Sequence, residues 1–346
     1  MKILIISHYN PQVFEYGGLA TFVRNLSSGL RELGHEVYFL STSSSAYRKD
    51  SNVVKVVPTA FHPKDIDSNV YRVIEYCLDT DGFYDTIIAN DYFSPCITRK
   101  SKLIAYIHNF VSSIWEFILF AYSDKIYTNS NMNKSIIEPH FKYVRTVTTS
   151  WTNKEPSKDV VVLHPPPPQP PEKIVKPNNN DLEELEEPIL CYVGRMQDYK
   201  NFNMFRKLVI DLRVNALVIS HDTPNIVEVF EYGGRNSKIM YFGEVPEELK
   251  WGIMKYCTLG VYPSLFDPYG LVPLEFVISK VPVVVSKNCG VTEVLKTVTF
   301  DPYNYNELVN VVKDVLKRRD EYLNELLDSP IIRTSWREFA KTLINV

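Results

Sequence analysis

The chain has 346 residues, a length that suggests about two domains with enough apolar surface for two packed cores. Hydrophobic residues make up 45% and charged residues 23%, which excludes a wholly disordered chain. The net charge of −3 gives no electrostatic case for nucleic acid or an anionic membrane, and the five scattered cysteines indicate neither a zinc site nor a disulfide framework.

The first forty residues predict one β-loop-α-β unit. Residues 2–6 form an apolar run typical of a strand buried on both faces. After a loop at residues 7–18, apolar residues recur at helical spacing as far as Leu33, and Gly34 is placed to end that helix. Residues 37–40 predict the next strand, so the pattern favours a parallel sheet.

The same alternation of strands and helices continues through the first half. Strands are expected at residues 53–57, 86–89, 103–107, 125–128 and 160–163, and helices at residues 70–78 and 114–122. Residues 110–122 are the most aromatic stretch, and a helix that lies at a lipid interface is one interpretation. Because the stretch has no Lys or Arg, burial under the sheet is the favoured interpretation.

A change in composition marks the domain boundary. Residues 165–188 combine a proline-rich run with an acidic stretch, and proline cannot continue a helix or a central strand. We therefore expect an amino-terminal domain at residues 1–164, an extended linker at 165–188 and a second domain at 189–330. Residues 331–346 predict a last helix that can pack back on the amino-terminal domain.

The second half repeats the α/β pattern. Strands are expected at residues 189–193, 216–220, 238–242, 259–262 and 281–285, and helices from about residue 201 and at 246–254, 271–279, 307–316 and 334–344. Two parallel α/β domains predict a central cleft, because ligands of such sheets bind outside the carboxyl ends of the strands.

Two glycine-containing segments are candidates for binding an anion. Gly17 and Gly18 precede the first helix, where backbone N–H groups can approach a negative group, although an ordinary loop is an equal alternative. Gly194, Arg195 and Lys200 follow a predicted strand, and a guanidinium with an ammonium suits a diphosphate. Their place at the end of a strand favours this interpretation over the alternative, in which the two are solvated surface cations. The dinucleotide and P-loop fingerprints are both missing, which disfavours a dehydrogenase and a P-loop ATPase.

Residues 262–275 are the most informative stretch. A predicted strand ends at Tyr262, a loop contains Asp267 and Gly270, and Glu275 lies about one turn into the following helix. A carboxylate on that apolar stretch is costly unless it accepts hydrogen bonds, which ribose hydroxyls would supply. The alternative is that Asp267 caps the helix and Glu275 pairs with a neighbouring cation.

These segments together resemble the large retaining glycosyltransferase family 4 (glycosyl transferases group 1), which has the GT-B fold. Asp267 and Glu275 resemble the family's Glu-x7-Glu signature. The remaining matches, in chain order, are Gly17-Gly18, Gly34-His35-Glu36-Val37, Gly194-Arg195, Lys200-Asn201, Pro263-Ser264, Pro268-Tyr269-Gly270-Leu271, and Pro282-Val283-Val284 with Gly290 and Glu293. Each match is weak alone, but their order and spacing are specific, and they span nearly the whole chain.

The resemblance implies two Rossmann-like domains, residues 1–164 on the acceptor side and residues 189–330 binding the nucleotide sugar. It also implies transfer of a sugar from a nucleotide-diphosphate sugar, such as a UDP- or GDP-sugar, to an acceptor hydroxyl with retention of configuration. It implies no metal or other cofactor. Arg195 and Lys200 would bind the diphosphate, and Glu275 would bind the ribose. Asp267 would contact the donor sugar, together with the main chain of Tyr269, Gly270 and Leu271. Gly17 and Gly18 would approach the diphosphate, and His108 would lie near the reacting carbon. An ordinary loop histidine is the alternative for His108.

Two departures from the family pattern stand out. Asp267 replaces the usual first Glu, which shortens its reach by about one methylene, and Cys289 replaces the second Gly of a Gly-Gly pair. A GT-B isomerase or phosphorylase and a non-catalytic nucleotide-sugar-binding protein remain as alternatives. Asp65 and Asp67 form a D-x-D, but two loop carboxylates alone are not a metal site.

The sequence gives little information on partners and location. The apolar start is too short for a signal-peptide core, and no run approaches the ~18 apolar residues of a membrane span. We therefore expect a cytoplasmic protein without a transmembrane segment, and nothing supports a peripheral membrane contact. The acceptor, whether glycan, lipid-linked or protein, is not specified.

Overall fold

The computed structural model describes residues 1–7, 17–41, 53–56, 66–90, 94–109, 114–148, 159–177, 180–232 and 235–345. The chain divides into two compact units, the first made of Met1–Pro166 with Thr334–Val346 and the second of Pro167–Arg333. Most of the segment predicted as a linker is thus counted with the second unit, and it holds a short helix, α5 (Asn180–Glu183).

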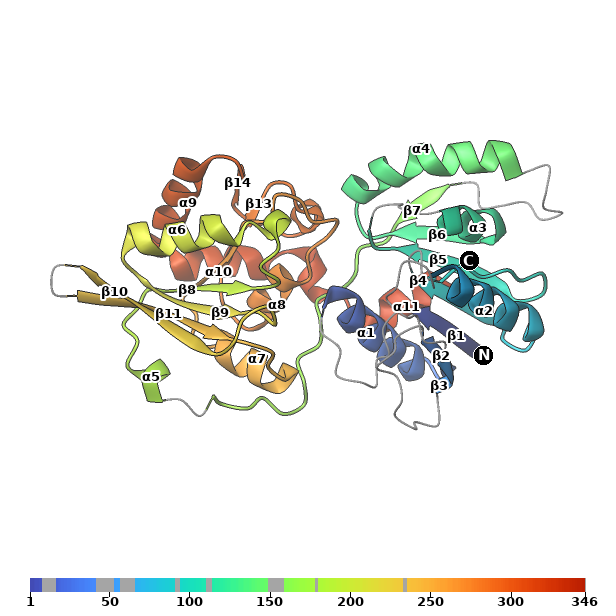
Figure 1. The fold of residues 1–346 in the computed structure, drawn as a ribbon, viewed down its shortest axis with the longest axis horizontal. Helices are drawn as coiled ribbons and strands as arrows, with labels where there is room; N and C mark the ends of the chain where they lie inside the picture. The colour runs from blue at the N-terminus through green and yellow to red at the C-terminus, as the bar shows by residue number, and fades with distance from the viewer. Residues whose placement is uncertain are drawn as a thin grey trace. The chain divides into compact units, whose positions relative to one another are not determined.

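Within the described residues, the first unit is built on a parallel seven-stranded sheet in the order β3-β2-β1-β4-β5-β6-β7 (Figure 1). The strands are β1 (Lys2–Ser7), β2 (Glu36–Ser41), β3 (Val53–Val56), β4 (Thr86–Asn90), β5 (Lys102–Ile107), β6 (Lys125–Thr128) and β7 (Val160–Val162). The strand order reverses between β1 and β4, as it does in Rossmann-like sheets.

Side chains of successive strand residues enter two different cores, one on each face of this sheet. Ile3 and Ile5 belong to a core with residues of α1 (Gly18–Glu32) and α11 (Trp336–Ile344). Leu4 and Ile6 belong to a core with residues of α2 (Ile66–Asp79), α3 (Ile114–Tyr122) and α4 (Asn131–Thr148). The period of two in a buried strand explains why β1 is apolar throughout.

The carboxyl-terminal helix α11 completes the first unit by packing against α1. A Cβ atom on Gly29 would lie 2.3 Å from the carbonyl oxygen of Trp336, so only glycine allows this approach of the two backbones. The Phe22 ring lies 5.4 Å from that of Trp336 and 5.8 Å from that of Phe339, measured between centroids. Ser335 begins α11 with a capping box, which satisfies N–H groups at the helix start.

The second unit has, in the described residues, a seven-stranded sheet in the order β10-β11-β9-β8-β12-β13-β14 (Figure 1). Its strands are β8 (Ile189–Val193), β9 (Asn215–Ile219), β10 (Ile226–Tyr232), β11 (Arg235–Phe242), β12 (Leu259–Tyr262), β13 (Val283–Ser286) and β14 (Thr299–Phe300). The edge strand β10 is antiparallel to β11, and the other pairs are parallel. The helices are α6 (Phe202–Leu212), α7 (Glu247–Met254), α8 (Val272–Ile278), α9 (Tyr305–Lys317) and α10 (Arg319–Leu327).

The predicted strands and helices are confirmed, with boundaries moved by a few residues. The structure adds α4, β10, β14 and α10, which the sequence patterns did not indicate. Helix α4 contains Pro139, a residue that argues against a helix interior. In the aromatic stretch, burial is confirmed for Leu119 and Phe120, whereas residues 110–113 lie outside the described residues.

The expectation that the cysteines form no disulfides is wrong. Cys77 is bonded to Cys96, and Cys191 is bonded to Cys257, which leaves Cys289 as a buried free thiol. Cys191 lies on β8 and Cys257 lies just before the neighbouring strand β12, although 66 residues separate them in the sequence. Sequence spacing cannot reveal such pairs, because the sheet order decides which strands are neighbours.

Candidate functional site

The predicted diphosphate-binding and signature segments follow two strands that are neighbours in the second sheet. Gly194 follows β8 directly, and Asp267 lies in the loop after β12. Because β8 and β12 are parallel and adjacent, their carboxyl ends bring both segments to the same edge of the sheet. The strand order also reverses between these two strands, at the place where open α/β sheets bind ligands.

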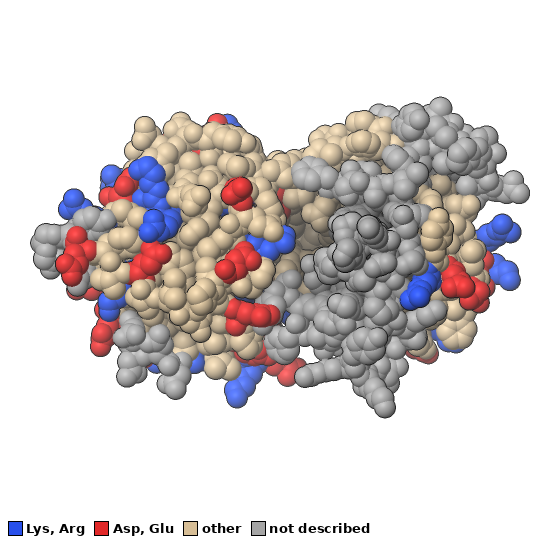
Figure 2. Space-filling model, viewed as in Figure 1, with Lys and Arg blue, Asp and Glu red and all other residues tan. Residues whose placement is uncertain are grey.

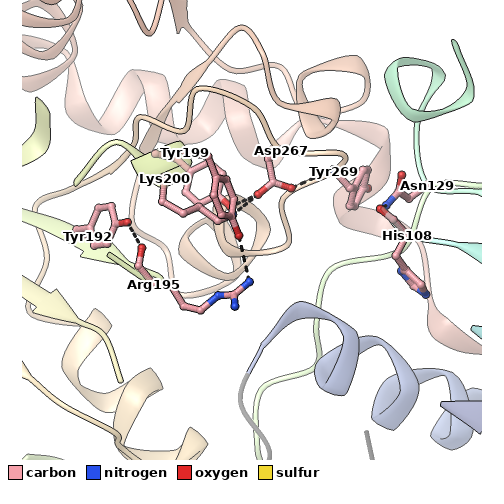
Figure 3. Close-up of polar contacts among 9 residues, drawn as sticks. His108, Asn129, Tyr192, Arg195, Tyr199, Lys200, Asp267 and Tyr269 are labelled. Atoms are coloured by element: carbon pink, nitrogen blue, oxygen red, sulfur yellow. Dashed lines mark hydrogen bonds and ion pairs between the residues drawn. The ribbon is translucent and has the colours of Figure 1, made fainter. Parts of the chain in front are cut away.

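Lys200, Tyr262 and Asp267 form a hydrogen-bonded cluster at this edge (Figure 3). The Lys200 ammonium donates to Asp267 Oδ2 at 2.5 Å and to the Tyr262 hydroxyl at 3.1 Å. The Tyr262 hydroxyl in turn donates to Asp267 Oδ2 at 2.5 Å. The side chains of Lys200 and Asp267 are only 15% and 12% exposed, so solvent screens their attraction weakly. We call these three residues the Lys200 cluster.

Burial and charge act in opposite directions on the Lys200 cluster. Burial would lower the pKa of Lys200 and raise that of Asp267, but their mutual attraction outweighs burial. The pKa of Lys200 is therefore raised and that of Asp267 lowered. Burial and the nearby Asp267 charge raise the pKa of Tyr262 well above its ordinary value, so its hydroxyl stays protonated. The ion pair is thus fully formed at neutral pH.

Arg195 is connected to the same edge through Tyr199. The exposed guanidinium donates from Nη2 to the Tyr199 hydroxyl at 3.0 Å, and the Tyr199 ring centroid lies 5.2 Å from the Lys200 ammonium (Figure 3). The Tyr192 hydroxyl donates to the Arg195 carbonyl oxygen at 2.6 Å, which fixes the backbone after Gly194. The structure therefore places both predicted diphosphate-binding cations beside Tyr199, a residue that sequence reasoning had not singled out.

The loop that contains Asp267 is held in place by its own backbone. Asp267 Oδ1 accepts a hydrogen bond from the Tyr269 N–H at 3.1 Å, and the Asp267 backbone forms a bridge with Cys289. Asp267 is therefore no helix cap, because the residue at the start of α8 is Leu271. Gly270 has φ of +94°, a conformation that other residues rarely adopt. Cys289 has φ of −118°, so its position does not require the family's usual glycine.

Glu275 is paired with a cation, as the alternative interpretation of the sequence proposed. It is 3% exposed and lies on α8, where Oε1 accepts a hydrogen bond from the Lys250 ammonium at 3.0 Å. Lys250 comes from α7 and also contacts Glu247 at 2.9 Å. No sequence pattern pointed to Lys250, because the contact joins two helices rather than residues close together in the chain.

His108 lies in the first unit, immediately after β5. Its ring is packed against Phe22 and Tyr106, with centroids 4.3 and 4.7 Å apart, and burial lowers its pKa to about 3. Nε2 lies 3.3 Å from Asn90 Oδ1. The Asn129 side chain donates to the His108 carbonyl oxygen at 2.9 Å (Figure 3). The imidazole is therefore neutral, with the geometry of a donor at Nε2.

The glycine pair also lies in the first unit. Gly17 precedes α1 with φ of +123°, and Gly18 is the first residue of the helix. A Cβ on Gly17 would meet no heavy atom within 4 Å, so the backbone conformation, not crowding, favours glycine there. Residues 8–16, the rest of the predicted loop, lie outside the described residues.

The described residues contain no cluster of three or more His, Cys, Asp or Glu side chains that could hold a metal ion. Asp65 lies outside them, and Asp67 is in the first turn of α2. On the face shown in Figure 2, acidic and basic side chains of the described residues are interspersed. In the same part of the chain, none of the helices has the length and apolar character needed to cross a membrane.

Comparisons with known proteins cover both units. Residues 16–153 match the model "Glycosyltransferase Family 4", and residues 176–328 match the model "Glycosyl transferases group 1". An uncharacterised glycosyltransferase of Methanocaldococcus jannaschii is 25% identical over 390 aligned residues, which cover 100% of this chain and 97% of the relative.

Solved structures with the same fold cover the whole chain as well. Sucrose-phosphate synthase from Thermosynechococcus elongatus superposes with a TM-score of 0.69 at 16% identity, covering 99% of this chain and 94% of that one. Anabaena HepE, solved in complex with UDP and glucose, gives a TM-score of 0.61 at 13% identity, with 99% and 95% covered. The two family models and the shared fold show that the chain belongs to the group 1 glycosyltransferases and has the GT-B fold.

Proposed function

We propose that this glycosyltransferase moves a sugar from a nucleotide-diphosphate sugar to an acceptor hydroxyl with retention of configuration. The observation that supports this most directly is the Lys200 cluster, which lies with Arg195 at the carboxyl ends of β8 and β12. Two cations at a strand-order reversal suit a diphosphate. The printed description of Anabaena HepE, in complex with UDP and glucose, is consistent with such a donor.

The reaction breaks the bond between the anomeric carbon and the diphosphate oxygen. In the retaining route, the acceptor oxygen forms its bond to that carbon on the same face, and its proton passes to a phosphate oxygen of the leaving group. Negative charge grows on the diphosphate as the bond breaks, so Arg195 and Lys200 would stabilise the transition state more than the bound donor. The Tyr262 hydroxyl and Asp267 would keep the Lys200 ammonium in position.

The remaining predicted residues have roles that follow from the family resemblance. We propose that Asp267 and the backbone of residues 269–271 contact the donor sugar, and that Glu275 binds the ribose. His108, with its neutral ring, would hydrogen-bond near the reacting carbon, and Gly17 and Gly18 would approach the diphosphate. Because two cations neutralise the leaving group, we propose that the reaction needs no divalent metal ion.

A donor screen followed by a hydrolysis assay tests the proposal. We expect one of UDP-, GDP-, ADP- or TDP-glucose, or the matching mannose or N-acetylglucosamine donors, to raise Tm, because binding to the native state stabilises it. The same donor should slowly release its nucleoside diphosphate with water as acceptor. Lys200→Ala and Arg195→Ala should each slow this release by roughly 10²–10³-fold, the loss typical of one charge-stabilising group.

The matched control is Lys207→Ala, which removes an exposed lysine of α6 whose partner is Asp211. It should leave donor release unchanged. Unaltered release in both Lys200→Ala and Arg195→Ala would contradict the site assignment. A donor that raises Tm but is never cleaved would instead indicate a nucleotide-sugar-binding protein, and a rearranged sugar formed without acceptor would indicate an isomerase.

A further inference from the structure

Lys250 of α7 contacts two carboxylates, the buried Glu275 of α8 and the partly buried Glu247 of its own helix. Its ammonium lies 3.0 Å from Oε1 of Glu275 on α8, and 2.9 Å from Oε2 of Glu247, one turn earlier on α7. The side chains of Lys250, Glu275 and Glu247 are only 12%, 4% and 17% exposed. Three ionisable groups are thus held together where little water can reach them.

Burying three ionisable groups contributes little to the stability of a fold, because of its desolvation cost. Each charge loses hydration on burial, and well-packed apolar side chains often serve stability as well or better. Burial alone would lower the pKa of Lys250, but the attraction of Glu275 and Glu247 raises it, so the ammonium stays charged. Two carboxylates and one ammonium also leave one net negative charge in the group.

Glu247 is itself anchored, so Lys250 is held from two sides. The Trp251 indole N–H donates to Glu247 Oε2 at 3.3 Å, and the Lys250 ammonium lies 5.9 Å from the Trp251 ring centroid. Trp251 is 1% exposed and cannot move freely. The ammonium therefore presents a fixed donor to Glu275, and it sets the orientation of that carboxylate.

We propose that Lys250 is a positioning residue that holds Glu275 aligned to accept hydrogen bonds from the ribose of the donor. The inference rests on the proposed function, in which Glu275 binds the ribose. A carboxylate can accept about four hydrogen bonds, so an ion pair at Oε1 is compatible with bonds to ribose hydroxyls. Lys250 acts through Glu275 and needs no contact with the nucleotide.

The experiment compares ribose with deoxyribose nucleotides in each variant. UDP, GDP, ADP and CDP are titrated calorimetrically into the full chain, and the tightest of them is compared with its 2′-deoxy and 3′-deoxy forms. A hydrogen bond from a hydroxyl to a carboxylate makes the wild type prefer ribose by roughly 10- to 100-fold. In Lys250→Met we expect this preference to fall to about threefold or less, with the deoxy nucleotides bound almost as in the wild type.

Two further variants separate positioning from general damage. Lys250→Arg keeps a charged donor and should retain most of the ribose preference, whereas the matched control Lys207→Met should retain all of it. If Lys250→Met does not fold, Lys250→Gln takes its place in the ribose and deoxyribose titrations.

The outcomes distinguish this inference from the proposed function. If a nucleotide binds and Lys250→Met keeps the full ribose preference, Lys250 does not position Glu275, although the proposed function stands. An equal loss of affinity for ribose and deoxyribose forms would likewise overturn the inference and indicate a structural role. If the wild type binds none of the four nucleotides, Glu275 has no ribose to bind and the inference fails, whereas the donor screen decides the proposed function separately.

Discussion

Replacing Lys200 by methionine should destabilise the second unit, because it leaves Asp267 charged and buried. Methionine keeps most of the aliphatic length, while Asp267 keeps the Tyr262 hydroxyl and the Tyr269 N–H as hydrogen-bond donors. Breaking a buried pair by removing one partner costs about 3–5 kcal/mol. At about 2–4 °C of Tm per kcal/mol for a domain of this size, Tm should fall by roughly 6–20 °C.

The loss should become smaller at lower pH. In the wild type, burial raises the pKa of Asp267 but Lys200 lowers it further, so the net shift is downward from 3.8. The stabilisation of the folded state that follows from this lowered pKa is present above pH 3.8 and is lost as pH falls through the folded-state pKa of Asp267. In Lys200→Met, burial dominates and raises the pKa of Asp267. Protonation then removes the buried charge and reduces the destabilisation of the variant, at a pH where the wild type is unaffected.

A double variant separates stability from catalysis. Lys200→Met combined with Asp267→Asn removes both charges and should recover part of the lost Tm, yet it should not recover donor release. Scanning calorimetry at pH 7 and pH 5 measures the stabilities, with Lys207→Met as the control for an exposed ion pair, which should change Tm little. The reasoning is refuted if Lys200→Met loses no more Tm than Lys207→Met, or if the double variant is less stable than both single variants.

Three further predictions concern other parts of the molecule. Gly29→Ala should destabilise the first unit by about 1–3 kcal/mol in urea denaturation, because its Cβ would clash with the Trp336 backbone, whereas Ser28→Ala on the same helix should have little effect. The stability of the wild type relative to His108→Gln should fall as pH drops from 6.5 toward 3, because His108 is protonated in the unfolded state over this range but stays neutral in the folded state. An NMR titration that gives an ordinary pKa for His108 would contradict this. Donor release should be unchanged by EDTA, and its loss with recovery by Mg²⁺ would show that the two cations do not suffice.

The fold could be predicted from the sequence wherever the pattern was local. Strands buried on both faces appear as short apolar runs, which is why β1, β5 and β8 were found within a residue or two. Helix α4 was missed because Pro139 interrupts its pattern, and β10 was missed because an antiparallel edge strand has no α/β unit around it. Local preference gives way to tertiary packing in both cases.

The candidate site could be predicted only as far as its loops. Lys200 and Asp267 were found because each follows a strand, and the sheet order brings the two loops together. Tyr262 was noticed only as a strand end, although its hydroxyl bonds to both charged groups. Lys250 could not be predicted, because its contact with Glu275 depends on how close α7 lies to α8, and no spacing in the sequence encodes that distance.

The return of α11 to the first unit has a consequence for the order in which the protein is made. The amino-terminal segment leaves the ribosome first, and Tyr106 already covers part of the Phe22 ring, but the side of α1 that packs against α11 is covered only after Trp336 and Phe339 have been synthesised. The second unit, residues 167–333, is continuous in sequence and can complete its core earlier. The first unit begins to be translated before the second but completes its core after it. Nascent chains that stop before α11 should therefore expose an apolar surface to chaperones.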